Sequence, residues 1–260
     1  MPGDVSVAGL LVSVTLVAVA VILSAVQHLG LERSLIWASV RALVQLLIIG
    51  AALSLVIDSE TPLIWSWLWI VAMVVFAADT VGRRAPEAPG IRLIALAAFA
   101  AAAVVTLGIL FGFQIFPMEA RALVPLAGMM IGNSMTATVV VANRTVEELR
   151  DKRLEVEARL ALAQPSVEAA RPYLRSSIRT ALIPRIETTK AVGIVFLPGA
   201  MTGLILAGVD PVEAVRVQAA VMYLVLGSTA ITTAVVAFGM ARKLFTPDHR
   251  LVPLARPADG

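Results

Sequence analysis

The sequence contains no cysteine, and only 15% of its 260 residues are charged. Without cysteine the chain has no disulfide, no thiolate nucleophile and no cysteine-based metal site. Soluble domains have about 25% charged and about 45–50% apolar residues. Here 59% of the residues are hydrophobic and the mean hydropathy is +0.89. These values exclude a soluble enzyme, a disordered chain and a nucleic-acid-binding protein, and they predict an integral membrane protein.

Seven apolar runs approach or exceed the roughly 20 residues that a helix needs to cross a bilayer. They are residues 5–26, 35–57, 62–78, 93–116, 122–142, 191–209 and 217–241. The runs are too long and too uniformly apolar for barrel strands, which alternate over about 10 residues, so they predict helices. No basic residue precedes the first run, which we therefore interpret as a retained helix rather than a signal peptide. We predict an all-α membrane protein, with residues 1–260 in one transmembrane domain.

Basic residues are distributed unequally among the connections between these runs. With the N-terminus outside, the inner connections 27–34, 79–92, 143–190 and 242–260 hold 18 Lys and Arg, whereas the outer segments hold 2. Cytoplasmic connections of membrane proteins carry the excess of basic residues. The sequence therefore predicts an external N-terminus, a cytoplasmic C-terminus and a long cytoplasmic segment between the fifth and sixth crossings.

The sequence lacks two features of energised transporters: acidic residues inside the apolar runs and a nucleotide-binding loop. No Asp or Glu lies inside any of the seven runs, whereas proton-coupled carriers usually need one. The chain also lacks the GxxxxGK[ST] phosphate loop. An ATP-driven transporter built on this chain would need a motor on another chain, docked at the inner face. The two histidines lie outside the runs, so we predict no metal site.

The segment 143–190 is the longest connection, and we expect its first part, 143–163, to continue the fifth helix. Pro172 and Pro184 then bracket a short stretch that is both basic and amphipathic. Such a helix either lies on the anionic inner leaflet or docks a soluble partner. The candidate coupling residues are Arg175, Ser176, Ile178, Arg179 and Leu182.

Arg41 and Gln45 are polar residues four positions apart within the second run. Residues spaced by four share one face of a helix. Polar groups at membrane depth often mark a transport pathway. Arg41 is, however, near enough to the inner end of its run to extend its side chain to the membrane surface, as membrane-anchoring arginines do.

The fifth run contains Gly128 and Gly132 at the spacing that lets two helices approach closely. Asn133, Ser134 and Thr136 follow directly. Such small polar residues either bond to neighbouring helices or line a pathway. All three are candidates for residues that line the pathway.

The sixth run contains Pro198, which removes a helical hydrogen bond and predicts a kink or an opening. Transporters place irregular helices at the membrane midplane, where freed backbone groups face the substrate. Asn133 and Thr202 each lie 11 residues into their runs, about 16 Å along a helix and near the middle of a core about 30 Å thick. The pathway candidates here are Pro198, Gly199, Met201 and Thr202, with Gly203 as a packing residue.

Three strings carry a resemblance to a known family: RALVQLLIIG (41–50), GMMIGNSMTAT (128–138) and AVGIVFLPGAMTGLILAGVDPVEAVRVQ (191–218). They resemble the FetB-like ABC transporter permeases over nearly the whole chain. That family includes the membrane subunit of a bacterial iron exporter and plant permeases of aluminium tolerance.

The resemblance implies a permease domain that acts as a homodimer in the lipid bilayer of the bacterial plasma (inner) membrane. It implies an exporter, of iron or another metal, driven by a separate cytoplasmic ABC subunit that binds ATP and Mg, with no cofactor on this chain. Two other functions fit the residues alone. A stand-alone secondary carrier or channel would transport without ATP, and a membrane scaffold or sensor would not transport at all.

Overall fold

The computed structural model describes residues 7–56, 62–246, 248 and 250–253. Within these ranges the chain forms nine α-helices and no β-strand, with two isolated bridges. The predicted all-α class is therefore confirmed for this part of the chain. The chain divides into two compact units, Met1–Pro62 with Leu206–Gly208, and Leu63–Ile205 with Val209–Gly260.

The first unit contains α1 (Val7–Val26) and α2 (Glu32–Val56) joined by a tight turn. Ser24 is 2% exposed and organises this turn. Its hydroxyl donates to Glu32 Oε1 at 2.7 Å and accepts from the backbone N–H of Leu31 at 3.2 Å. Gly30 adopts a φ of +68°, a conformation that costs glycine little.

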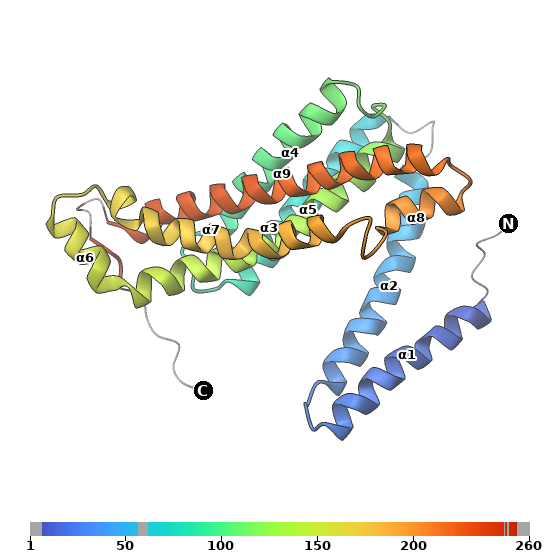
Figure 1. The fold of residues 1–260 in the computed structure, drawn as a ribbon, viewed down its shortest axis with the longest axis horizontal. Helices are drawn as coiled ribbons and strands as arrows, with labels where there is room; N and C mark the ends of the chain where they lie inside the picture. Colours follow the sequence, from blue (N-terminus) through green and yellow to red (C-terminus); the bar gives the residue numbers. More distant parts are fainter. Residues whose placement is uncertain (1–6, 57–61, 247, 249, 254–260) are drawn as a thin grey trace. The chain divides into compact units, whose positions relative to one another are not determined.

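The second unit is a bundle in which α9 packs against α4, α5 and α7, while α3 packs against α4 and α5 (Figure 1). Its helices are α3 (Leu63–Arg84), α4 (Ile91–Gly112), α5 (Ala120–Asp151), α6 (Arg153–Ala161), α7 (Ser166–Ala191), α8 (Gly199–Leu206) and α9 (Pro211–Leu244). The start of α9 is capped by Asp210, whose Oδ1 accepts from Val212 N at 2.9 Å. Pro211 at the first turn suits this position, because the first N–H groups of a helix have no partner within it.

Five of the described helices are long and apolar enough to cross a membrane: α2, α3, α4, α5 and α9. They correspond to the second, third, fourth, fifth and seventh predicted runs. The first run contains α1, whose described apolar stretch is the shorter Val12–Val26. Residues 5–6 and 57 of the predicted runs lie outside the described residues. Several membrane-length helices are thus present, while seven crossings and their orientation remain predictions.

The sixth predicted run, 191–209, does not form one continuous helix, and this expectation is corrected. Helix α7 extends to Ala191, residues 192–198 are not helical, and α8 has only 8 residues. At 1.5 Å per residue α8 is about 12 Å long, too short to cross a bilayer by itself. Pro198 cannot donate a helical hydrogen bond and disfavours a helical conformation at Leu197. The predicted opening at Pro198 is confirmed.

Pro172 and Pro184 do not bracket a separate short helix, contrary to our expectation. Both lie inside the 26-residue helix α7. The helix persists because one face packs along α5 and α9, burying Tyr173, Leu174, Ser177 and Ala181. Most helical stability in proteins comes from such packing rather than from intrinsic propensity.

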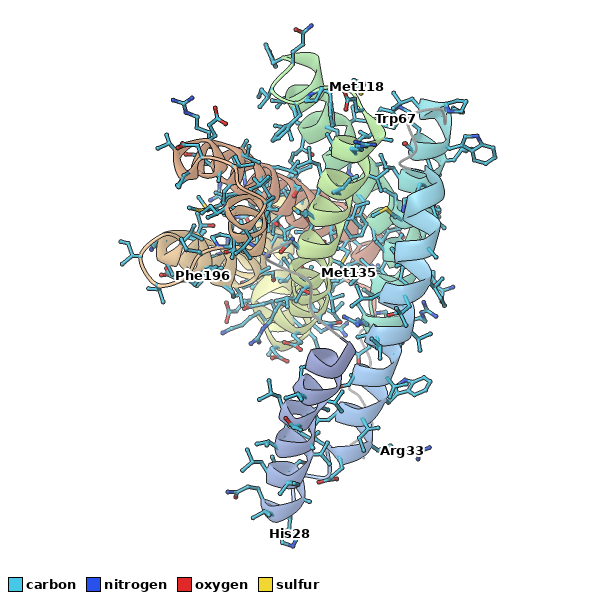
Figure 2. The ribbon with its side chains drawn as sticks, turned by 90° about the vertical axis from the view of Figure 1, so that its right-hand side faces the viewer. His28, Arg33, Trp67, Met118, Met135 and Phe196 are labelled. Carbon is cyan, nitrogen blue, oxygen red and sulfur yellow. The ribbon has the colours of Figure 1, made fainter. Side chains whose placement is uncertain are left out.

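Two segments expected on the inner side, 79–92 and 143–190, meet at one end of the second unit. Asn143 Nδ2 donates to the backbone carbonyl of Arg84 at 3.3 Å, and Arg150 lies 3.2 Å from Glu87. At the other end of α3 lie Trp67 and, in the α4–α5 connection, Met118 (Figure 2). Exposed tryptophans concentrate at membrane–water interfaces. Helices α3 and α5 therefore run in the same direction, while their orientation in a membrane stays a prediction.

Candidate functional site

A cavity of about 300 Å³ lies in the second unit between α5, α7, α9 and the start of α8. Its wall includes both polar and apolar side chains. It is lined by Met129, Asn133, Arg185, Thr188, Thr189, Val192, Phe196, Pro198, Gly199, Ala200, Gln218, Val221, Met222 and Val225.

The non-helical segment 192–198 closes one side of this cavity. Gly193 has a φ of +87° in the loop after α7, and its N–H donates to the carbonyl of Phe196 at 3.0 Å. This conformation is accessible mainly to glycine. Phe196 and Pro198 of this loop lie in the cavity wall. In Figure 2, Phe196 lies on the side of α7 and α8, and Met135 marks α5.

Asn133 and Arg185 form the main polar contact of the cavity. Arg185 Nη2 donates to Asn133 Oδ1 at 2.7 Å. The Asn133 amide is itself fixed, because its Nδ2 donates to the carbonyl of Met129 at 2.7 Å. Arg185 is half-buried, and it is the one charged side chain among the described residues that line the cavity. The site is therefore cationic.

Gln218, on α9, also lines this cavity. It is 8% exposed, and its Oε1 has no hydrogen-bond partner among the described residues. A buried acceptor without a partner costs free energy, about 1–3 kcal/mol in typical cases. In contrast, the Thr188 and Thr189 hydroxyls donate to backbone carbonyls one turn earlier, at 2.8 and 2.9 Å.

A smaller cavity of about 170 Å³ lies between α5 and α7. It shares three lining residues with the larger cavity: Asn133, Arg185 and Thr188. Thr136 lines only the smaller cavity. The Asn133–Arg185 contact is thus common to two hollows along the same helix pair.

The predicted pathway residues separate into two groups. Asn133, Pro198 and Gly199 come together in the larger cavity, and Thr136 faces the smaller one. Met201 and Thr202 lie on α8 but outside the residues that line either cavity.

Ser134 lies on a different face of α5, in the interface with α9. It is fully buried, and its hydroxyl is 3.0 Å from that of Ser228. It also donates to the carbonyl of Met130 at 2.7 Å. This geometry is that of a packing residue with satisfied hydrogen bonds.

The predicted packing glycines have unequal surroundings. A Cβ atom added to Gly128 would lie 3.1 Å from Met73 Cε on α3, so a close approach occurs there. At Gly132 and Gly203 an added Cβ would meet no atom within 4 Å among the described residues. Arg41 and Gln45 lie on α2 in the first unit, and both are exposed.

The predicted coupling residues lie on α7. Arg175 and Arg179 are exposed, and Ser176 Oγ donates to Glu148 Oε1 on α5 at 3.0 Å. A surface groove runs along this helix and includes Ile178 and Leu182. Nearby, Tyr173 donates to Glu155 Oε2 at 3.0 Å and joins α7 to α6.

Arg185 and Gln218 line the cavity but were not among the site residues predicted from the sequence. Arg185 was counted only as one of many basic residues of the segment 143–190. Its signal was the polar group Arg185, Thr188 and Thr189 directly before an apolar run. Gln218 is the second residue of the seventh run, and its signal was an amide within an apolar run, as for Gln45.

Comparisons with known proteins find related membrane proteins. A family model described as "Uncharacterised protein family (UPF0014)" matches residues 7–245. The UPF0014 membrane protein STAR2 of Oryza sativa is 38% identical over 84% of this chain and 76% of its own. The UPF0014 membrane protein YjkA of Bacillus subtilis is 36% identical over 90% of this chain and 94% of its own. The protein named "Probable iron export permease protein FetB" of Escherichia coli is 30% identical over 94% of this chain and 93% of its own.

No solved structure matches the chain. The sequence comparisons cover nearly all of both units, including the cavity and the segment 192–198. The chain belongs to the UPF0014 family of membrane proteins.

Proposed function

We propose that this chain is the membrane-spanning permease subunit of an ABC transporter that works as an exporter. The observation that carries the proposal is the cavity around Asn133 and Arg185, lined by α5, α7, α9 and a broken helix. Polar groups in a membrane protein usually face such cavities and mark a substrate pathway. The E. coli relative named as an iron export permease supports transport as the function.

The sixth crossing, in this proposal, consists of the C-terminal part of α7, the segment 192–198 and α8. Helix α7 runs antiparallel to α5, because Ser176 meets Glu148 and Arg185 meets Asn133. If Asn133 is near the midplane, the end of α7 lies at membrane depth beside the cavity. The broken helix then resembles the discontinuous helices that form binding sites in transporters.

The ATP-binding subunit, in this proposal, docks at the N-terminal half of α7. Leu174 is fully buried and Ile178 packs against the core, so the apolar face of this helix is occupied by the bundle. This supports protein docking over a helix lying on the inner leaflet. Arg175 and Arg179 remain exposed beside the groove for an acidic partner surface.

The remaining parts of the proposal follow from the need for a motor. The sequence has no phosphate loop, so ATP and Mg bind to the partner chain. Two copies of the permease pair with the ATP-binding subunits in the bacterial plasma membrane. Iron or another metal, free or complexed, is the cargo class that the E. coli relative's name suggests.

The test is purification of the tagged full chain in mild detergent, with identification of the proteins that accompany it. An ATP-binding chain that co-purifies, and whose ATP hydrolysis drives uptake into inside-out vesicles, is the expected result. Transport without ATP or without that partner would indicate a stand-alone carrier or channel. Unchanged flux in a deletion strain would indicate a scaffold or sensor.

A further inference from the structure

The cavity wall carries the charge of Arg185, for which the described residues supply no carboxylate partner. On α7, Lys190 lies 2.8 Å from Glu187. Arg175 and Arg179 form no ion pair among the described residues, but both are exposed to solvent, whereas Arg185 is partly buried. Arg185 has no carboxylate within 4.0 Å among the described residues. A partly buried charge is costly unless it is paired. The wall therefore presents a cation that lacks its counter-ion.

The contact with Asn133 orients this cation without neutralising it. The Asn133 amide is anchored to the carbonyl of Met129, so its Oδ1 holds one N–H of the Arg185 guanidinium in place. A guanidinium carries five N–H donors in a planar fork that matches carboxylate and phosphate oxygens. The remaining donors are available to an incoming group.

Gln218 supplies a second unsatisfied group in the same wall. Its Oε1 is buried without a partner, and the residue is 8% exposed. A ligand with an N–H or O–H group would satisfy this acceptor. The cavity thus offers a fixed cation and a free hydrogen-bond acceptor, while the described residues gather no cluster of three or more His, Asp or Glu for a bare metal ion.

We propose that the cargo of this cavity is an anion, held through a carboxylate or phosphate group by Arg185, with a donor group of the cargo on Gln218. This inference rests on the proposed transport function and names its substrate class. A free divalent cation is repelled by the unpaired guanidinium. A metal is therefore carried only within a complex of net negative charge.

Binding to the purified full-length chain in lipid nanodiscs tests the proposal without any ATP-binding partner. The probes are citrate, ferric citrate, inorganic pyrophosphate and Mn²⁺ alone, measured by equilibrium dialysis. We expect at least one anionic probe to bind, and Arg185→Gln to weaken its binding about tenfold or more, as losing a hydrogen bond to a charged group does. The preferred anion, citrate or pyrophosphate, then distinguishes carboxylate from phosphate cargo.

Two further variants separate a local role from a general one. Lys190→Gln also removes one positive charge from α7, but Lys190 is exposed and lines neither of the two cavities beside Asn133. This variant should therefore bind the anionic probe as the wild type does. Gln218→Glu places a negative charge in the cavity wall and should weaken anion binding. If Arg185→Gln does not fold, Arg185→Lys tests the same site, because it keeps the charge but loses the planar fork.

Binding of Mn²⁺ alone at a site that Arg185→Gln strengthens would overturn the proposal. Anion binding that neither Arg185 variant nor Gln218→Glu changes would also overturn it, as would the absence of binding by every anionic probe. These outcomes are independent of the ATP-driven mechanism. Anion binding in a chain that recruits no ATPase would refute the proposed motor and leave the anionic cargo standing.

Discussion

Arg185 on α7 donates to Oδ1 of Asn133 on α5 at 2.7 Å, across 52 residues of sequence. This contact fixes the register of two antiparallel helices and puts a cation in the cavity wall. A second contact of the same helix pair, Ser176 to Glu148 at 3.0 Å, lies nearer the α6 end. Helix α7 therefore links the proposed docking surface directly to the proposed substrate cavity.

Asn133→Leu should reduce transport much more than it reduces the amount of folded protein. The variant removes the acceptor that orients Arg185, a hydrogen bond to a charged group worth about 1.5–3 kcal/mol. We expect transport in inside-out vesicles to fall about tenfold or more. Asn143→Leu, which changes an asparagine of the same helix away from the cavity, is the matched control. Normal transport by Asn133→Leu would show that Asn133 has no role in the pathway.

Single cysteines should map the cavity, because the natural chain has none. Cysteine at Asn133 or Ala200, both in the cavity wall, should react with small water-soluble thiol reagents in at least one nucleotide state. Cysteine at fully buried Ser134 should not react. Cysteine at Thr202, which lies outside the cavity lining, should react more slowly than at Ala200. Equal labelling at positions 133 and 134 would contradict this geometry.

Ser134 and Ser228 should contribute to stability rather than to transport. Their hydroxyls are 3.0 Å apart in the buried α5–α9 interface. Hydrogen bonds between membrane helices have coupling energies of about 0.6 kcal/mol on average. A double-mutant cycle with Ser134→Ala and Ser228→Ala should give a value of this order by chemical unfolding, with transport retained. A large loss of transport in Ser134→Ala alone would return Ser134 to the pathway.

Replacing both Arg175 and Arg179 with Glu reverses their charge. This double variant should lower the permease-stimulated ATP hydrolysis of the partner subunit. Both side chains are exposed beside the α7 groove, so the fold should survive. Arg144→Glu with Arg153→Glu is the control of equal charge change, since exposed ion pairs contribute about 0–1 kcal/mol. If the α7 variant binds and stimulates the ATPase normally, the partner docks elsewhere.

The α6–α7 contact should weaken in acid. Hydrogen bonds from Lys152 and then from Tyr173 lower the pKa of Glu155 below its ordinary value. Because the pKa of Glu155 is lower in the folded chain than in the unfolded chain, where it is about 4.3, the ionised carboxylate stabilises the contact above that pH. This contribution is lost as the pH falls through the pKa of Glu155 in the folded chain. Hydrogen exchange of residues 153–161 should therefore show less protection at pH 3 than at pH 6.

Tyr173→Phe should make this acid effect smaller, because it removes one of the hydrogen bonds to Glu155. Protection that is the same at both pH values in the wild-type chain would contradict the assigned role of Glu155.

The sequence by itself determined the all-helical membrane class and most helix positions. Runs of apolar residues as long as α3, α4 and α9 are compatible with few other structures, because lipid leaves backbone groups no partner outside a helix. Local chemistry also determined the opening at Pro198, since proline lacks the N–H that a helix requires. The polar residue Asn133 was identified because an amide at membrane depth is unusual.

Only the tertiary structure decided which polar residues face the cavity. Asn133 and Ser134 are neighbours in sequence, yet a rotation of 100° per residue puts one against Arg185 and the other against Ser228. Helix α7 continues through two prolines because packing on α5 and α9 outweighs the lost hydrogen bonds. In the sequence Arg185 is one of many basic residues of the segment 143–190, and only the packing of α7 along α5 puts it in the cavity wall. Contacts between helices distant in sequence depend on packing of the whole bundle, and no local pattern encodes them.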